Sequence, residues 1–209
     1  HTLFPYTTLF RSRAIASLLS NRTVNKGKII LGIDPGTNLL GFGVIRVNEK
    51  GKPEFVDAGV LDLRKEKNAY QKLMMIRRYV SEACDNYKPE HLAIESPFMG
   101  KNAQVIFKLA RAQGVALEVA VEKGLEITEY APRKAKIAIC GNGAASKEQV
   151  SLMVQKTLGI KIDNYPLDST DALAIALCHY YQMESPLSAA KEENSWEKFI
   201  ASHPDRVKN

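Results

Sequence analysis

The 209-residue chain has few residues of the kinds that build disulfide frameworks, zinc sites or membrane spans. Its three cysteines and four histidines are scattered, without the close pairs that a zinc site needs, and unpaired cysteines are typical of a reducing cytoplasm. No apolar run approaches the roughly 20 residues of a membrane-spanning helix, and the sequence contains no internal repeat. These absences predict a soluble, cytoplasmic protein with no membrane partner.

A large excess of one charge is also missing from most of the chain. The formal net charge is +6, but residues 1–27 hold four basic residues and no acid, which leaves 25 basic residues against 23 acidic ones elsewhere. Total basicity is therefore weak evidence for DNA binding. Local distribution is better evidence, because residues 96–114 and 130–147 contain Lys and Arg but no Asp or Glu, and phosphate neutralisation needs such local patches.

Two acidic residues each end a predicted strand. The apolar run of residues 28–34 favours a buried strand and ends on Asp34, just before a Pro-Gly turn, and residues 91–95 repeat the pattern and end on Glu95. Open α/β sheets bind ligands at the carboxyl ends of their strands, so both carboxylates are expected beside one crevice. Each also has an ordinary interpretation, because Asp is common before turns and Glu can end a strand in solvent.

Two further acids lie on one predicted helix. Asp168 and Asp171 follow Pro166 in a strongly helix-forming stretch, where their spacing places them on one face. Asp168 could simply complement the helix dipole, whereas Asp171 lies in an apolar helix and needs a partner or a metal. Clustered carboxylates repel one another unless a divalent cation compensates them, and Mg²⁺ prefers oxygen ligands. A pair of such ions about 3.5–4 Å apart can hold both oxygens of a displacement at phosphorus, which is nuclease chemistry.

Four ordered stretches of the chain resemble the RuvC family of Holliday junction resolvases. They are residues 30–37, 93–103, 141–150 and 168–176, and the resemblance covers about residues 28–182. It implies an α/β protein with a ribonuclease-H-like fold, in which a five-stranded mixed sheet, three antiparallel strands followed by two parallel ones, is flanked by helices. Local patterns agree with this fold. We expect further strands at 41–47, 55–63 and 125–130, and helices at 69–87, 102–122, around 133–139 and at 146–158.

The resemblance implies an Mg²⁺-dependent endodeoxyribonuclease, a hydrolase that resolves four-way DNA junctions by symmetric phosphodiester hydrolysis during recombination and repair. By the same resemblance, Asp34 would bridge two Mg²⁺ ions, Glu95 would ligate one of them, and Asp168 and Asp171 would ligate the other. Mn²⁺ would be able to substitute. Water activated by metal would attack the phosphodiester.

The resemblance also assigns DNA contacts. Phe98 matches an aromatic residue that stacks on a base at the junction, and its position after Pro97 favours an exposed loop over core packing. Lys136 and Lys147 match lysines near the scissile strand, and Lys147 is expected to be catalytic as well; without the resemblance both would be solvated helix residues. Further expected DNA contacts are Lys101, Arg111 and Arg133.

A four-way junction has two-fold character, so a C₂ homodimer with two identical sites would cut two opposed strands. The helix expected at residues 102–122, with Val105, Leu109, Val115 and Val119, is a candidate dimer surface and equally a candidate core element. The family resemblance further implies branch-migration motor proteins as partners.

The two ends of the chain differ from the predicted domain at 28–182. Residues 1–27 are expected to be a non-native or disordered leader, because residues 2–12 resemble the translation of a sequencing adapter. The tail at 183–209 contains mixed charges and a short amphipathic piece around Trp196, which we expect to dock on the domain or to be partly disordered.

Three rival interpretations use the same features. Residues 32–37 also resemble the phosphate loop of actin-like ATPases and sugar kinases, but those proteins need two such domains and would not explain Asp168 with Asp171. A non-cleaving DNA-binding module with the same fold would be expected to lack at least one of the acids. The small YqgF-type nuclease-like family shares the first strand but would lack the Phe98 loop and is shorter.

Overall fold

The structure is a computed structural model and describes residues 27–97, 102–161 and 166–185. Five strands form one sheet in the order β3-β2-β1-β4-β5. The first three strands pair antiparallel, and β4 and β5 run parallel to β1, as the resemblance predicted. The strands are β1 (Lys28–Asp34), β2 (Leu39–Val47), β3 (Pro53–Asp62), β4 (His91–Glu95) and β5 (Glu126–Tyr130).

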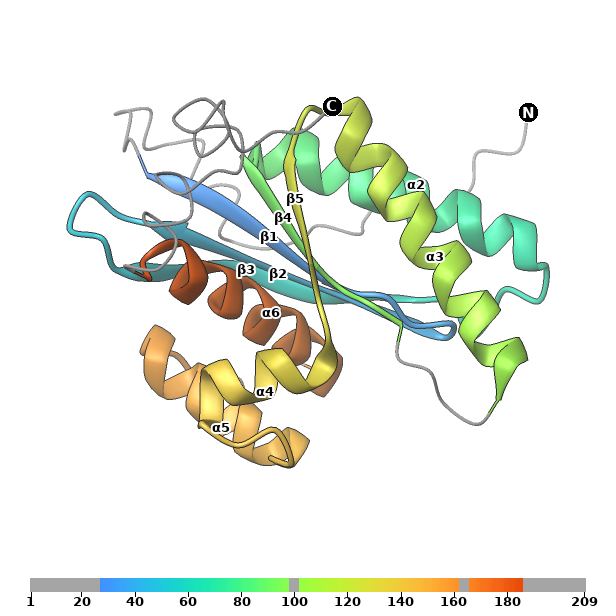
Figure 1. Ribbon diagram of the computed structural model, residues 1–209. Coiled ribbons are helices and arrows are strands. Elements are labelled where there is room, and N and C mark those ends of the chain that lie inside the picture. The colour runs from blue at the N-terminus through green and yellow to red at the C-terminus, as the bar shows by residue number, and fades with distance from the viewer. Residues whose placement is uncertain (1–26, 98–101, 162–165, 186–209) are drawn as a thin grey trace, which may run out of the picture.

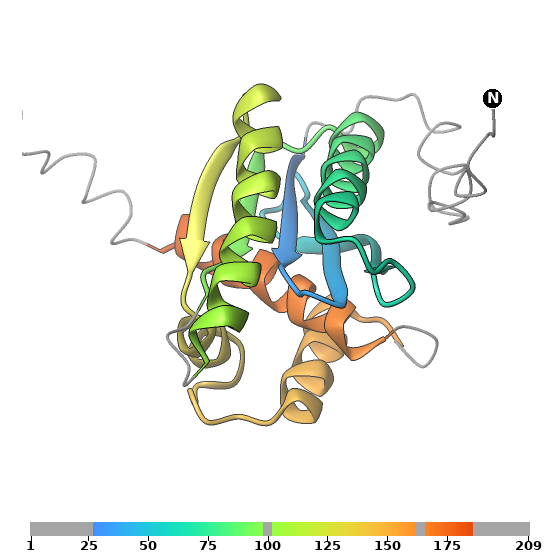
Figure 2. The same ribbon diagram turned by 90° about the vertical axis from the view of Figure 1, so that its right-hand side faces the viewer.

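Helices cover both faces of this sheet (Figures 1 and 2). On one face lie α2 and α3, and on the other α6 packs directly on β1 and β2, with α4 and α5 packed on α6. The helices are α2 (Ala69–Tyr87), α3 (Ala103–Glu122), α4 (Pro132–Cys140), α5 (Lys147–Leu158) and α6 (Leu167–Met183). Within the described ranges, no helix is long and apolar enough to cross a membrane.

Polar side chains fix where the helices begin. Asn68 accepts hydrogen bonds from the first amides of α2, and Asn102 does the same for α3, so the helix expected from residue 102 begins one residue later, after its cap. Ser146 and Gln149 form a reciprocal capping box at the start of α5. The caps therefore locate the chain turns on either side of the sheet.

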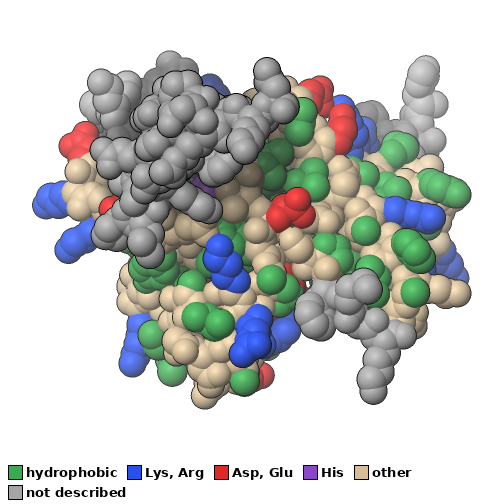
Figure 3. All heavy atoms as spheres, viewed as in Figure 1, with side chains coloured by type: hydrophobic (Ala, Val, Ile, Leu, Met, Phe, Trp, Pro, Cys, Tyr) green, Lys and Arg blue, Asp and Glu red, His purple; other side chains and the backbone are tan. Residues whose placement is uncertain are grey.

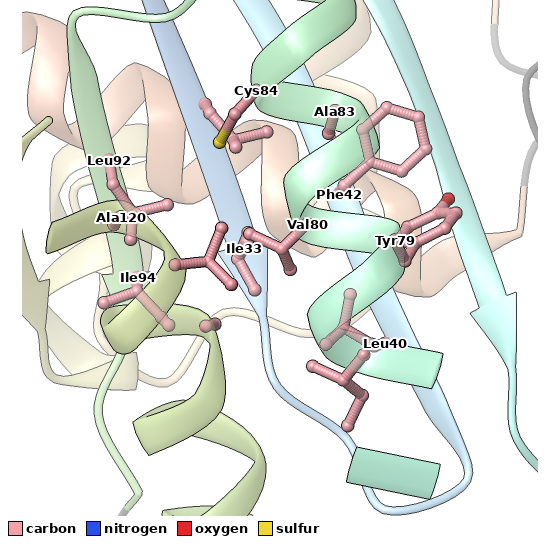
Figure 4. Packing of buried hydrophobic residues seen from close by; sticks show 14 of the residues in the cluster. Ile33, Leu40, Phe42, Tyr79, Val80, Ala83, Cys84, Leu92, Ile94 and Ala120 are labelled. Atoms are coloured by element: carbon pink, nitrogen blue, oxygen red, sulfur yellow. The ribbon is translucent and has the colours of Figure 1, made fainter. Parts of the chain in front are cut away.

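The core on the α2 and α3 face is continuous from β2 to β4 (Figure 4). Ile33 of β1 points to this face and is 1% exposed, whereas Ile30 belongs to the core cluster of the α6 face and is fully buried. Phe42 and Tyr79 meet edge to face with ring centroids 5.4 Å apart. Because β1 is buried on both sides, its sequence is a nearly unbroken apolar run instead of an alternating one.

Glycines in β1 and β2 let α6 approach the sheet closely. A Cβ atom at Gly32 would lie 2.1 Å from the carbonyl oxygen of Ala172, and one at Gly41 would lie 2.1 Å from that of Asp168. Neither distance is possible for a real side chain, so these positions require glycine. The close contact brings the first turn of α6 against the carboxyl end of β1, where Asp34 pairs in register with Gly41.

Several sequence predictions lie outside the described residues. They are those for Phe98 and Lys101, for the leader up to residue 26, and for the tail from residue 186, including Trp196. The predicted domain end at 182 is close to the end of α6 at Met183.

Candidate metal centre

Three carboxylates from two distant segments meet at the carboxyl end of β1. Asp34, Asp168 and Asp171 each offer an oxygen atom, and these oxygens all lie within 4.8 Å of one another. All three residues are partly buried. In the part of the chain that the structure describes, this is the group of acidic, His or Cys residues close enough to share a metal ion.

Glu95 lies beside this group and is not one of its members. The β4 strand runs parallel to β1 with Ile94 opposite Ile33, so Glu95 leaves the sheet at the same edge as Asp34. Burial is the main cause of its raised pKa, and the charges of Asp34 and Asp171 add to it. The structure therefore brings Glu95 to the crevice, and its assignment as a metal ligand stays a prediction.

The site has more negative charge than its surroundings compensate. Burial is the main cause that raises the pKa of Asp34 to about 7, and the charges of Asp171 and Asp168 add to it against the opposing charge of Lys147. Burial likewise raises the pKa of Glu95 to about 8. Buried carboxylates that resist ionisation in this way become stable anions when a cation joins them. An all-oxygen set of this kind fits a hard divalent metal ion.

Lys147 provides part of the missing positive charge. Its Nζ atom lies 2.5 Å from Oδ2 of Asp171 and 3.5 Å from Oδ1 of Asp168. Burial disfavours the ammonium form, but the hydrogen bond to Asp171 and the neighbouring acids outweigh this effect and raise the pKa of Lys147. The side chain is therefore a permanent cation at the edge of the acid cluster.

The other predicted DNA contacts lie in different settings. Arg111 on α3 and Arg133 on α4 are exposed, and in Figure 3 Lys and Arg side chains lie among hydrophobic ones over α4 and α5, in the lower part of the view. Lys136 donates a hydrogen bond of 2.8 Å to the carbonyl oxygen of Ala145, so it ties α4 to the turn before α5. Burial is the main cause that raises the pKa of Glu95, and the charge of Lys136 slightly opposes this rise.

Sequence reasoning missed a polar network that holds the exit of β4. The Ser96 amide donates to the carbonyl oxygen of Tyr130 at 2.9 Å, and the Ser96 hydroxyl donates to Glu129 at 3.3 Å. Gln113 of α3, which is 6% exposed, donates to the same Glu129 carboxylate at 2.5 Å. The one sequence signal was a Gln on the apolar face of α3, since buried polar groups need partners. The network fixes the residue that follows Glu95.

Comparison with known proteins gives consistent matches over most of the chain. The sequence profile of a family described as "Crossover junction endodeoxyribonuclease RuvC" matches residues 30–179. A protein of that name from Bacteroides fragilis is 50% identical over 185 residues, which is 88% of this chain and 97% of its own length. The structure of Thermus thermophilus RuvC is similar with a TM-score of 0.67 and 35% identity, covering 75% of this chain and 96% of that one. T. thermophilus RuvC in complex with a Holliday junction substrate is similar with a TM-score of 0.66 and 32% identity, over the same shares of the two chains.

Proposed function

The chain belongs to the RuvC family of crossover junction endodeoxyribonucleases, and from this premise we propose that Asp34, Asp168 and Asp171 are the centre of its active site. Its function is the resolution of Holliday junctions in recombination and repair, by hydrolysis of DNA phosphodiesters. The observation that supports the site assignment is the convergence of three carboxylate oxygens within 4.8 Å. Family membership decides against the kinase-like and non-cleaving alternatives.

The family is metal-dependent, and the donor set suits Mg²⁺. We propose two ions, with Asp34 shared between them, Glu95 on one, and Asp168 with Asp171 on the other; Mn²⁺ would substitute. Bound metal would supply positive charge that polarises the scissile phosphate and acidifies the attacking water. The raised pKa values of Asp34 and Glu95 support this assignment, because they mark acids that a cation would stabilise as anions.

We propose that residues of the chain position the substrate and stabilise the negative charge that develops on its phosphate. Asp34 ends a buried strand, and pairing of β1 with β2 fixes its backbone at this position. Lys147 is a cation beside the acids, where its ammonium group can donate to a phosphate oxygen as negative charge develops during hydrolysis. In this hydrolysis the oxygen of water forms a new bond to phosphorus while the bond from phosphorus to the leaving oxygen breaks, and a proton passes to that oxygen. The products are a phosphate monoester at one end of the cut and a hydroxyl group at the other.

We further propose that the DNA lies across the edge of the sheet at which these acids gather. The contacts would be Arg111, Arg133 and Lys136, with Phe98 and Lys101 on the β4–α3 connection. Such phosphate contacts supply affinity and register and do not distinguish sequences. We also propose that the protein is cytoplasmic and that branch-migration motor proteins are its partners.

A homodimer would use an exposed stripe of α3. Phe107 is 66% exposed and Val121 is 69% exposed, and Gly114 lies midway between them with open space where a side chain would be. Residues seven apart lie on one side of a helix, and a glycine at the centre permits close approach of a second helix. The four residues named on this helix as either dimer surface or core divide between the two settings: Val119 is fully buried in the core, Leu109 and Val115 are partly buried, and Val105 is exposed.

The test compares labelled four-way junctions with linear duplex DNA, in Mg²⁺ or in EDTA. Wild type should make paired nicks in the junction only, and only with metal. Asp34→Asn should bind the junction and cut it at least about 1,000-fold more slowly, because removal of a central catalytic group typically costs that much. Asp85→Asn, on α2 and paired with Lys123, is the control and should cut normally. Equal cutting of linear duplex, or full activity of Asp34→Asn, would overturn the proposal.

A further inference from the structure

A groove of about 310 Å³ lies between the first turns of α2, the first half of α3 and the β1–β2 turn. Figure 2 shows this region at the lower end of the sheet, where the first turns of α2 and α3 flank the exit of β1. The groove has an apolar floor that includes Ile76 and Ala112. Four basic residues line it and no acid does: Lys67, Lys72, Lys108 and Arg111.

These four cations are not used to pair acids of the fold. Within residues 27–97, 102–161 and 166–185, the ion pairs involve other basic residues, such as Arg77 with Glu122, and none of the four groove cations. Lys72 donates a hydrogen bond of 3.1 Å to the carbonyl oxygen of Thr37, and so holds the β1–β2 turn. The remaining three are exposed. A concave surface lined by one sign of charge attracts anions.

The wall of the groove is close to the metal centre in sequence. Gly36, which is part of this wall, follows Asp34 after one intervening residue, and Thr37 comes next. Tyr70, which is 75% exposed, also lines it and offers an aromatic face to a base. A basic groove with an exposed aromatic ring is the usual arrangement for holding a nucleic-acid strand without reading its sequence.

We propose that this groove binds the DNA strand that continues from the scissile phosphate, with its phosphates against Lys67, Lys108 and Arg111 and a base on Tyr70. The inference rests on the proposed function, because the scissile phosphate is placed at Asp34. It adds a second binding region on the α2 and α3 side of the crevice, opposite the basic α4 and α5 side. The strand would therefore be held on both sides of the acids.

The test uses the full chain with Asp34→Asn, so that binding is measured without cutting. The affinity for a labelled four-way junction is measured by fluorescence anisotropy at several salt concentrations. Lys67→Gln and Lys108→Gln should each weaken binding about 3–10-fold and reduce the slope of log Kd against log salt by about one, as expected for one lost phosphate contact. Tyr70→Leu should weaken binding with the salt slope unchanged, because stacking is not ionic.

The control is Lys50→Gln, an exposed residue in the β2–β3 turn at the opposite end of β1 from Asp34. Its affinity and salt slope should equal those of the parent. If Lys67→Gln and Lys108→Gln match this control, the groove assignment is wrong. Metal-dependent junction cutting by the wild type is measured in parallel. If only the groove assignment is wrong, the wild type still cuts the junction; if the proposed function is wrong, it does not.

Discussion

The ammonium nitrogen of Lys147, in the first turn of α5, lies 2.5 Å from a carboxylate oxygen of Asp171 in α6. It also lies 3.5 Å from Asp168, so one lysine neutralises the two acids of α6 from the side. The pKa of Asp34 is raised mainly by burial, and the charges of Asp171 and Asp168 add to this effect against the opposing charge of Lys147. A metal ion that enters the cluster must therefore compete with an existing cation for the same oxygens.

From this competition we expect Lys147→Gln to bind Mn²⁺ about 3–10-fold more tightly, because a positive charge next to the ligands is removed. The same variant should cut junctions about 100-fold more slowly at saturating metal, because a donor to the phosphate is lost. Calorimetric titration and single-turnover cutting measure the two effects. Lys156→Gln, in the last turn of the same helix, should change neither. Weaker metal binding by Lys147→Gln would refute the competition.

Asp34→Asn should stabilise the metal-free protein at pH 8 by about 1–3 kcal/mol. The pKa of Asp34 is raised from 3.8 to about 7, so the folded protein favours the protonated acid and loses stability as pH rises from about 4 through about 7. Asparagine cannot ionise and avoids this loss. Urea unfolding in EDTA should show a large difference between variant and wild type at pH 8 and a smaller one at pH 5.

The control for this prediction is Glu49→Gln, an exposed acid in the β2–β3 turn, which should not change the pH dependence. Mg²⁺ should reduce the difference at pH 8, because binding to the folded wild type stabilises it. A difference of the same size at pH 5 and pH 8 would mean that the charge of Asp34 is not its cause.

Gly41→Ala should damage both the fold and the metal centre. The new Cβ atom would lie 2.1 Å from the carbonyl oxygen of Asp168, so the first turn of α6 must move away from β1. We expect at least a tenfold loss of metal affinity together with a loss of stability of about 1–3 kcal/mol, as for other overpacked sites.

Gly43→Ala separates these two effects. Its Cβ atom would lie 2.7 Å from the side chain and amide nitrogen of Leu173, which is further along α6 from the carboxylates. This variant should lose similar stability but keep its metal affinity within about threefold. Both are measured by urea unfolding and by Mn²⁺ titration. Equal loss of metal affinity in the two variants would show that general destabilisation explains the result.

The fold was largely predictable because its elements carry local signals. The bounds of β1, β4 and α2 were predicted correctly from apolar runs and helical spacing. The start of β2 was predicted two residues late, at residue 41. Its first residue, Leu39, belongs to the strand because it pairs with Asp62 in β3, and the sequence of β2 alone does not indicate this pairing. The approach of α6 to the sheet depends on Gly32 and Gly41, whose role is visible only with their partners in place.

The convergence of Asp34, Asp168 and Asp171 was predictable from the sequence, but its detailed geometry was not, and the roles of the site residues stay predictions. Asp34 and Glu95 each end a strand, and parallel pairing of those strands brings them to one edge. Side-chain directions decide that Asp34, Asp168 and Asp171 form one group and that Glu95 lies outside it. The Lys147 to Asp171 contact joins two helices and has no local signal. The sequence also did not indicate which face of α3 packs on the core. Part of the exposed face of that helix is apolar as well, so Val119 could not be assigned to the core.

The exposed stripe on α3 gives a last prediction. Phe107→Glu should convert the proposed dimer into a monomer, because two-fold pairing of α3 would bring the new charges close together in an apolar contact. Sedimentation velocity measures the change in assembly. The monomer should retain its acid cluster and nick one strand of the junction at a time. The yield of paired nicks should fall about tenfold or more, because two linked active sites no longer act on the same junction. Tyr181→Glu, which changes a residue near the C-terminal end of α6 that is 39% exposed, should remain dimeric and cut both strands. A dimeric Phe107→Glu would move the two-fold interface to another surface.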